Sequence, residues 1–182
     1  PEINNLVSDE ILQEMKDLGM PINTGENPPA LGNLLKSSEN WFVASPFILL
    51  ASNRSGDTPG YQFADYYVNF YDQDNENLTI NLNYENGGET GNGLGGYIVG
   101  EGNDFTVFAE VNSSYMTYEA SLVHVISGTI SEDGISDLYF ANFMLNNNGN
   151  PGGVWIENGE GRIVYDSDGF SEKMSESKGI SI

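Results

Sequence analysis

The sequence has no cysteine, a single histidine (His124) and only six lysine and arginine residues, against 27 aspartate and glutamate residues. Without cysteine the chain has no thiol nucleophile, no thiolate metal site and no disulfide. One histidine cannot supply a multi-histidine metal site, and a Ser-His-Asp triad would depend on His124 alone. Because most catalytic groups are missing, we expect a protein that is not an enzyme.

The shortage of basic residues also limits the partners. Binding to nucleic acid requires clustered Lys and Arg side chains that neutralise phosphates, whereas this chain carries a formal net charge of −21. The same charge disfavours anionic membrane surfaces, and no apolar run approaches the roughly 20 residues that a spanning helix needs. We therefore expect no nucleic-acid partner and no direct membrane insertion of this chain.

The N-terminal part of the chain differs from the rest. Residues 6–19 carry apolar side chains at helical spacing, with Ser8 as a candidate N-cap and Pro21 just beyond the end. A Pro-, Gly- and Asn-rich connector follows. The length suits one domain, so we expect residues 1–35 to form a helix and an extended connector packed on a main body of residues 36–182.

After this connector, apolar and polar residues alternate with period two, which is typical of half-buried β-strands. The clearest case is residues 77–84, where one set of side chains should be buried and the alternate set exposed. The expected buried side chains are Leu78, Ile80, Leu82 and Tyr84, and the expected exposed ones are Thr79, Asn81 and Asn83. Residues 122–130 and 135–145 are apolar on both faces, so both faces of these strands should be covered.

Further segments complete the expected fold. Residues 62–72 and 154–156 are expected as strands, residues 41–52 as a strand interrupted at Pro46, and the glycine-rich residues 87–96 as a long mobile loop. About nine strands, mostly antiparallel, after one short helix predict a mainly β fold, either an antiparallel β-barrel or a curved β-sandwich. We favour the barrel because closure removes strand edges, and we expect the helix to pack across an open end.

Several segments have a distinctive sequence. They are residues 19–25 (GMPINTG) ahead of Pro28-Pro29, residues 45–52 (SPFILLAS), residues 96–100 (GYIVG) leading into residues 105–108 (FTVF), and residues 166–170 (DSDGF). Together they resemble uncharacterised secreted lipoproteins of Bacteroides-type bacteria, which are thought to carry a calycin-like, that is lipocalin-like, β-barrel. Residues 33–41 depart from the usual pattern, where a Gly-Thr-Tyr-like strand start is common.

The resemblance has consequences for fold and location. It implies a calycin-like barrel, and it implies export to the periplasm or the outer cell surface. Because the chain begins at Pro1 and shows no signal peptide, we expect a processed chain whose export signal or lipid anchor lay upstream. The resemblance supplies no catalytic residues.

Two acidic segments are candidate calcium sites. Asp72, Asp74 and Glu76 stand at alternate positions, as at the start of a calcium loop, and Asp166 and Asp168 form a similar partial match. Oxygen-only ligation suits Ca²⁺. The spacing does not complete an EF-hand, however, and Asp side chains also stabilise turns through hydrogen bonds to the nearby backbone. A structural calcium ion and a simple turn therefore both remain open at these segments.

Aromatic side chains are the best candidates for ligand contact. Trp41, Tyr115, Tyr118 and Trp155 fall in loops or on the polar faces of strands, where a flat apolar ring with a polar tip can stack on a ligand. Scattered aromatic residues on the exterior of a barrel are the alternative. His124 lies on an apolar face, where it is either a buried core residue or a ligand contact inside the barrel.

Two classes of function remain open. The first is a surface or periplasmic binding module that holds a small apolar or glycan ligand in the mouth of a barrel. The second is a non-catalytic structural or assembly protein of the cell envelope. A ligand in the barrel would favour the first class, whereas a filled core with a large external apolar patch would favour the second.

Overall fold

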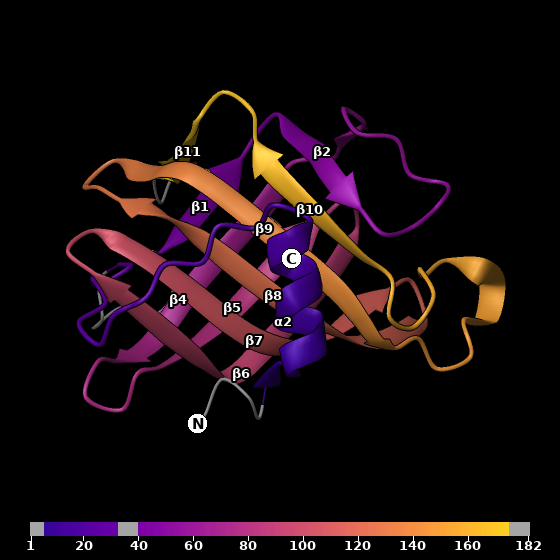
Figure 1. The fold of residues 1–182 in the computed structure, drawn as a ribbon, viewed down its shortest axis with the longest axis horizontal. Helices are drawn as coiled ribbons and strands as arrows, with labels where there is room; N and C mark the ends of the chain where they lie inside the picture. The colour runs from indigo at the N-terminus through magenta and orange to yellow at the C-terminus, as the bar shows by residue number, and fades with distance from the viewer. Residues whose placement is uncertain (1–5, 33–39, 175–182) are drawn as a thin grey trace.

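In the computed structural model, which describes residues 6–32 and 40–174, a single sheet of eleven strands carries one α-helix (Figure 1). The helix is α2 (Asp9–Asp17), and a short 3-10 turn spans Pro151–Gly153. The strands are β1 (Trp41–Ala44), β2 (Phe47–Ser52), β3 (Gln62–Phe63), β4 (Tyr66–Asp74), β5 (Thr79–Asn86), β6 (Glu89–Glu101), β7 (Asp104–Tyr115), β8 (Tyr118–Ile130), β9 (Gly134–Asn146), β10 (Gly161–Asp166) and β11 (Phe170–Lys173). The boundary expected at residues 35 and 36 lies outside the described residues.

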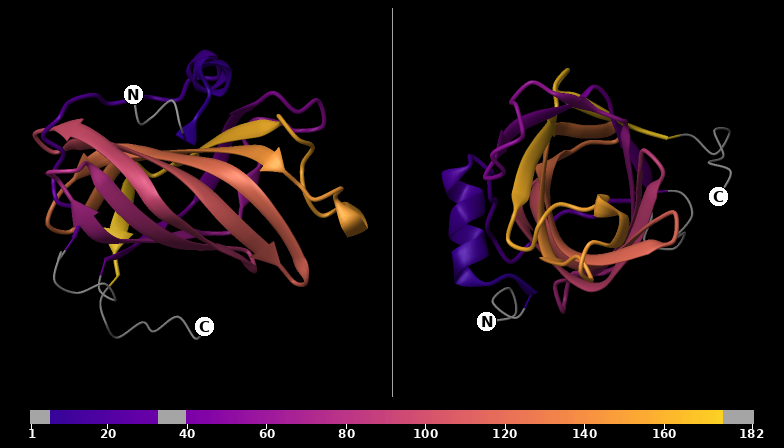
Figure 2. Two further views of the ribbon diagram at one scale, coloured as in Figure 1. Left: turned by 90° about the horizontal axis from the view of Figure 1, so that it is seen from below. Right: turned by 90° about the vertical axis from the view of Figure 1, so that its right-hand side faces the viewer.

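The sheet closes on itself into a barrel. Strands β4 to β9 pair antiparallel with their neighbours in chain order. Two interrupted strands complete the ring: β1 is continued by β2, and β10 is continued by β11. On one side, β10 and β11 both pair with β9; on the other, β10 pairs with β2 and β11 pairs with β1. The view along the barrel shows the ring directly (Figure 2, right). The mainly β, antiparallel fold expected from the sequence is therefore confirmed, as is the interruption at Pro46.

The two ends of the barrel are built from different loops. One end, here called the mouth, carries residues 53–65, 87–88, 116–117 and 147–160, which connect β2 to β3 and β4, β5 to β6, β7 to β8 and β9 to β10. The opposite end carries the turns at residues 75–78, 102–103 and 131–133. Leu31, from the N-terminal connector, is buried in the interior core.

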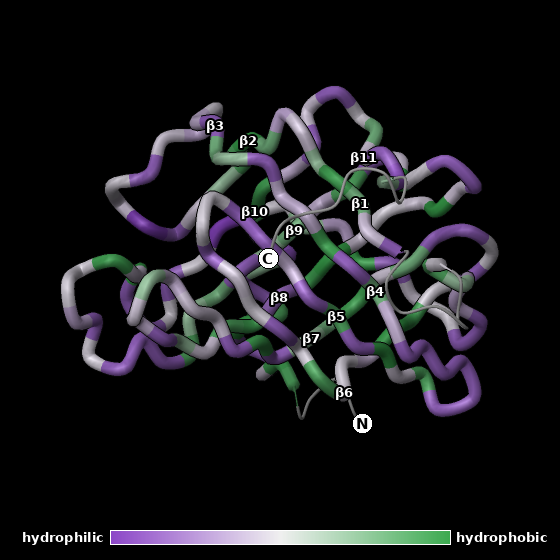
Figure 3. Tube along the Cα trace, turned by 180° about the vertical axis from the view of Figure 1, so that it is seen from behind, coloured by the Kyte–Doolittle hydropathy of each residue, from purple (hydrophilic) through white to green (hydrophobic). Residues whose placement is uncertain are grey.

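The interior is filled by the alternate side chains of each strand. On β5, Ile80, Leu82 and Tyr84 are buried, and hydrophobic segments alternate with hydrophilic ones along the strands β4 to β7 of the back wall (Figure 3). Leu78 was expected among them, but it precedes β5, has a φ of 56° and is half-buried. Thr79, Asn81 and Asn83 are half-buried rather than exposed, because β5 lies between β4 and β6 and side chains of neighbouring strands shield one another.

The helix lies on the outer wall of the barrel. Ser8 caps its N-terminus by accepting a hydrogen bond from the Ile11 amide at 3.3 Å, and Met15 is fully buried. The helix and the connector cover a second apolar cluster that includes Val123, Val125 and Phe143. This explains why β8 and β9 are apolar on both faces. The helix covers a side wall and not an open end, so the expected position was wrong (Figure 2, left).

Three local expectations also need correction. Residues 87–96 are not a long loop, since only a tight turn precedes β6. Glycines suit this strand because a Cβ on Gly91 would lie 2.5 Å from the Tyr84 ring. The strand expected at residues 62–72 is split into β3 and β4, and Ala64 between them is exposed. Residues 154–156 form no strand, because hydrogen bonds between their backbone and the side chains of Asn147 and Asn150 fix them in a loop. Among the described helices, none is long and apolar enough to cross a membrane.

Candidate functional site

Four of the five candidate ligand-binding side chains belong to the mouth half of the barrel. Tyr115 and Tyr118 pair with each other across the β7–β8 turn, and Tyr115 also pairs with Glu89 of β6. Both tyrosines share the strand faces of the buried inward residues, so they lie on the inner face of the rim. His124 lies inside the barrel on β8, and Trp155 lies in the loop 147–160.

The fifth candidate is separate from the others. Trp41 begins β1 and alternates with the buried Phe42, so it faces outward, and it pairs with Asn69 toward the opposite end of the barrel. Nothing places it near the mouth.

A cluster of aromatic rings lies beneath the mouth. The ring of His124 is 4.6 Å from that of Tyr84 and 4.7 Å from that of Phe140, and Tyr66 is 4.6 Å from Phe140, all between centroids. The four side chains are 1–5% exposed, and they come from β4, β5, β8 and β9. These four residues are called the ring cluster below.

Polar atoms of this region lack hydrogen-bond partners. The Tyr66 hydroxyl, both ring nitrogens of His124 and Nε1 of Trp155 are buried and unpaired. Burial lowers the pKa of His124 to about 3, so its imidazole is neutral at physiological pH. Burial, and next the charge of Glu89, raise the pKa of Tyr66 far above its ordinary value. Since buried polar atoms normally bind protein, water or a ligand, these atoms mark a place where a polar atom is expected.

The loop 147–160 covers this end of the barrel. In the axial view it lies across the ring (Figure 2, right). Asn150 fixes the backbone of Trp155 on both sides, by accepting from its amide at 2.9 Å and donating to its carbonyl at 2.8 Å. Ile156 belongs to the interior core, and the Trp155 ring packs against that core. The loop therefore presents two apolar side chains to the interior.

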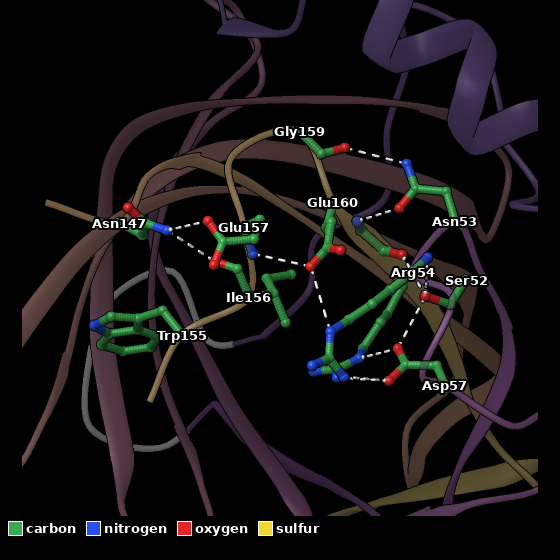
Figure 4. A network of polar contacts seen from close by, with 12 residues as sticks. Ser52, Asn53, Arg54, Asp57, Asn147, Trp155, Ile156, Glu157, Gly159 and Glu160 are labelled. Atoms are coloured by element: carbon green, nitrogen blue, oxygen red, sulfur yellow. Dashed lines mark hydrogen bonds and ion pairs between the residues drawn. The ribbon is translucent and has the colours of Figure 1, made fainter. Parts of the chain in front are cut away.

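An ion-pair network fastens this loop to the loop after β2 (Figure 4). Asp57 accepts from Nε and Nη2 of Arg162 at 2.6 and 2.9 Å, and from Nη1 of Arg54 at 3.0 Å. Arg54 also reaches Glu160, at 3.3 Å. Hydrogen bonding to Arg162, despite the opposing effect of burial, holds the pKa of Asp57 well below its usual range. Asn53 adds two hydrogen bonds, to the Gly159 carbonyl and from the Gly161 amide.

Glu89 is a residue of this region that the sequence analysis missed. The Tyr84 hydroxyl donates to it at 2.5 Å and is also hydrogen-bonded to Ser113. Burial raises the pKa of Glu89. If residues 89–96 had been interpreted as a strand, the period-two alternation would have placed Glu89 on the same face as Gly91, which is the inner face. In the structure Glu89 pairs with Asn86.

The acidic segments proposed for calcium serve turns. The carboxylate of Asp74 accepts from the backbone and side chain of Asn77 and from the Glu76 amide, while Asp72 accepts from Asn81. Among residues 6–32 and 40–174, no three His, Cys, Asp or Glu side chains are grouped so that they could hold a metal ion. These contacts explain the segments as turns, and calcium binding there stays a prediction.

The second acidic segment is partly buried at the junction of β10 and β11. One oxygen of Asp166 accepts from the Ser45 amide at 3.2 Å and from the Ser171 hydroxyl at 2.7 Å, whereas Oδ1 is buried without a partner. Burial raises the pKa of Asp166. Asp168 accepts from the Phe170 amide within the turn. Asp166 thus holds β1, β10 and β11 together where the two interrupted strands meet.

Comparisons of the chain with protein-family models, with curated proteins and with solved structures gave no match.

Proposed function

We propose that this protein is a binding module that holds a small, mainly apolar ligand in the mouth half of the barrel, beneath the loop 147–160. One observation carries the proposal. The ring cluster and Trp155 bring four unpaired, buried polar atoms into the interior of a mainly apolar barrel. Leaving such an atom unpaired costs about 1–3 kcal/mol, and a bound molecule with one or two polar atoms would remove that cost.

The lining favours an apolar ligand over a glycan. The ring cluster and its neighbours Phe47 and Val164 are aromatic or aliphatic, and few hydrogen-bonding groups lie among them. A glycan carries a hydroxyl on most of its carbons, and burying these hydroxyls without partners is costly. A planar molecule with a single hydrogen-bonding group matches the lining better.

Access to the interior is through the mouth. Three large apolar side chains that are exposed belong to mouth segments: Tyr61, Met116 and Val154. The loop 147–160 is held by polar contacts at its stem, so it can open there without disturbing the barrel strands. We propose that this opening admits the ligand.

The location of the module is proposed from the resemblance alone. The resemblance to exported lipoproteins supports a place at the cell envelope, on a lipid anchor upstream of this chain. The alternative, a structural or assembly protein of the envelope, predicts that the mouth takes up no small molecule.

Fluorescence of Trp155 tests the binding function. In a Trp41→Phe background Trp155 is the only tryptophan. Titration with N-phenyl-1-naphthylamine, a neutral apolar dye, should give saturable binding with quenching of Trp155 by energy transfer. Acetophenone, which has a hydrogen-bond acceptor, should displace the dye more effectively than ethylbenzene, which has none.

A matched pair of variants locates the site. Tyr66→Phe removes an inward hydroxyl and should remove the advantage of acetophenone, an effect of about 1 kcal/mol. Tyr67→Phe changes the adjacent, outward ring of the same strand and should leave both competitors unaffected. If the dye does not bind saturably, or if Trp155 is not quenched, the binding function is wrong.

A further inference from the structure

Among residues 6–32 and 40–174, the carboxylate of Glu89 forms no ion pair. Its hydrogen-bond partner is the hydroxyl of Tyr84, which is itself hydrogen-bonded to Ser113. The nearest guanidinium that acts on its charge, Arg162, is already bound by both oxygens of Asp57. A half-buried carboxylate thus lies inside the mouth, and its charge is balanced only at a distance, by Arg162.

Tyr84 connects this carboxylate to the ring cluster. Its hydroxyl binds Glu89, while its ring lies 4.6 Å from His124 and 6.0 Å from Tyr66. Aromatic faces attract cations through their quadrupoles, and the attraction grows when the site is dry. Since His124 is neutral, no positive charge from the ring cluster opposes a cation there.

The charge of the surroundings also favours a cation over an anion. Both arginines of the mouth network, Arg54 and Arg162, are paired with Asp57, and Arg54 is also paired with Glu160. The whole chain carries a formal net charge of −21, which raises the local concentration of cations and repels anions. An anionic ligand would meet Glu89 without a free guanidinium to bind it.

We propose that the ligand of this site is a small organic cation, whose ammonium group lies against Glu89 and the ring cluster while its apolar part lies beneath the loop 147–160. This inference rests on the proposed function, because it names the chemical class of the same ligand. Glu89 balances the charge, the rings desolvate it, and the unpaired hydroxyl of Tyr66 and nitrogens of His124 bind the polar atoms that the ligand carries elsewhere.

Two probes of equal shape separate charge from apolar burial. Phenyltrimethylammonium and tert-butylbenzene differ only in the central atom of the trimethyl group and its charge. Each is titrated into the Trp41→Phe protein with Trp155 fluorescence as the readout, at physiological and at high salt. We expect the cation to bind at least about tenfold more tightly than the neutral probe.

Matched variants assign that difference to Glu89. Glu89→Gln keeps the shape and should remove most of the preference for the cation, while the affinity for tert-butylbenzene stays within about twofold. Glu110→Gln, on the exposed outer face of β7, changes the net charge by the same amount and should leave the preference intact. The variants are compared only after circular dichroism and melting curves show that each is folded; if Glu89→Gln does not fold, Glu89→Ser serves in its place.

The outcomes separate this inference from the proposed function. Equal affinities for the two probes would overturn the cation inference and leave apolar binding standing. A preference that survives Glu89→Gln, or that vanishes at high salt in the unmodified protein, would show attraction by the overall charge, and would also overturn it. If neither probe binds, the proposed function fails together with the inference.

Discussion

At the scale of single residues, His124 is held neutral inside the barrel by burial alone. It is 1% exposed, and its pKa lies at about 3 against an ordinary value of 6.5. Neither ring nitrogen has a hydrogen-bond partner. Such a residue weakens the fold, since an apolar ring of similar shape would have no desolvated polar atoms.

The pKa of His124 predicts acid lability. Between pH 6.5 and about 3 the unfolded chain binds a proton at this residue and the folded chain does not, so the free energy of unfolding must fall as the pH is lowered. Between pH 7 and pH 4.5, the free energy of unfolding of the wild type should fall by about 2–3 kcal/mol more than that of a His124→Phe variant. Urea unfolding across this range measures the difference.

Carboxylates with shifted pKa values also change the stability at acid pH, and they do so with both signs, as Asp57 and Glu89 show, which is why the comparison with the variant is needed. The lowered pKa of Asp57 removes stability as the pH falls below its ordinary value, and the raised pKa of Glu89 adds stability as the pH falls through its folded value. Both terms cancel in the difference. The free energy of unfolding of Tyr67→Phe should depend on pH as that of the wild type does. If the free energy of unfolding of His124→Phe also showed the wild-type pH dependence, this would contradict the assigned pKa.

The alternation on β5 gives a second prediction at this scale. Ile80 is 1% exposed inside the barrel, so Ile80→Ala should lower the free energy of unfolding by about 2–5 kcal/mol. Thr79→Ala, on the outer face of the same strand, should change it by less than about 1 kcal/mol. Denaturant unfolding compares the two. A small loss for Ile80→Ala would mean that the inner face of β5 meets water.

At the scale of elements, two segments that are remote in sequence close the mouth together. The loop after β2 and the stem of the loop 147–160 meet through Asp57, Arg162 and Glu160. Asp57 is 8% and Arg162 19% exposed, so this pair is better shielded from solvent than an ordinary surface pair. The network therefore holds the loop over the interior.

Asp57→Asn tests that role. It leaves the Arg162 guanidinium without its counter-charge, and should lower the free energy of unfolding by about 2–3 kcal/mol. Because the pKa of Asp57 is lowered in the folded protein, the whole loss of unfolding free energy should be seen above about pH 4, and this loss should become smaller as the pH falls further. Amide hydrogen exchange should also become faster in residues 147–160.

Asp65→Asn provides the control for this change. Asp65 lies between β3 and β4, and within the described part of the chain its carboxylate forms no ion pair. Its substitution should leave both unfolding and exchange near the wild-type values. Exchange in the loop that stays slow in Asp57→Asn would mean that Trp155 and Ile156, and not the ion pairs, hold the loop closed.

At the scale of the whole molecule, the excess of acidic residues repels itself in the compact state. Salt shortens the range of this repulsion to about 8 Å at physiological ionic strength. NaCl should therefore raise the melting temperature, and screening alone would make CaCl₂ at matched ionic strength raise it by nearly the same amount. Scanning calorimetry in the two salts measures both shifts.

The same measurement decides the calcium prediction. A bound ion would add about 2.7 kcal/mol at a hundredfold excess over its Kd, so a clearly larger shift in CaCl₂ would establish a site at Asp72–Asp74–Glu76 or at Asp166–Asp168. Removing Asp74 or Asp166 would then tell the two segments apart. Equal shifts would leave these residues as turn formers only.

The sequence by itself determined what depends on neighbours along the chain. Ser8 and the apolar spacing after it fix the helix, and the alternation at Ile80, Leu82 and Tyr84 fixes which side of β5 is buried, because capping and the pleat are local properties. The same reasoning failed at Leu78, where a positive φ begins the strand one residue later. It also failed in the glycine-rich β6, where the Tyr84 ring occupies the space that a side chain at Gly91 would need.

The tertiary structure alone decided which side chains meet. Tyr66, Glu89, His124 and Trp155 come from four separate segments, and they gather in the mouth only because the register of each strand pair and the closure of the ring are set by contacts between residues remote in sequence. The position of the helix on the outer wall follows from the same closure, since the barrel leaves the outer faces of β8 and β9 apolar and in need of cover. Period and composition carry no information on such pairings. The fold class and single candidates such as His124 and Trp155 could therefore be predicted from the sequence, while their grouping with Tyr66 and Glu89 could not.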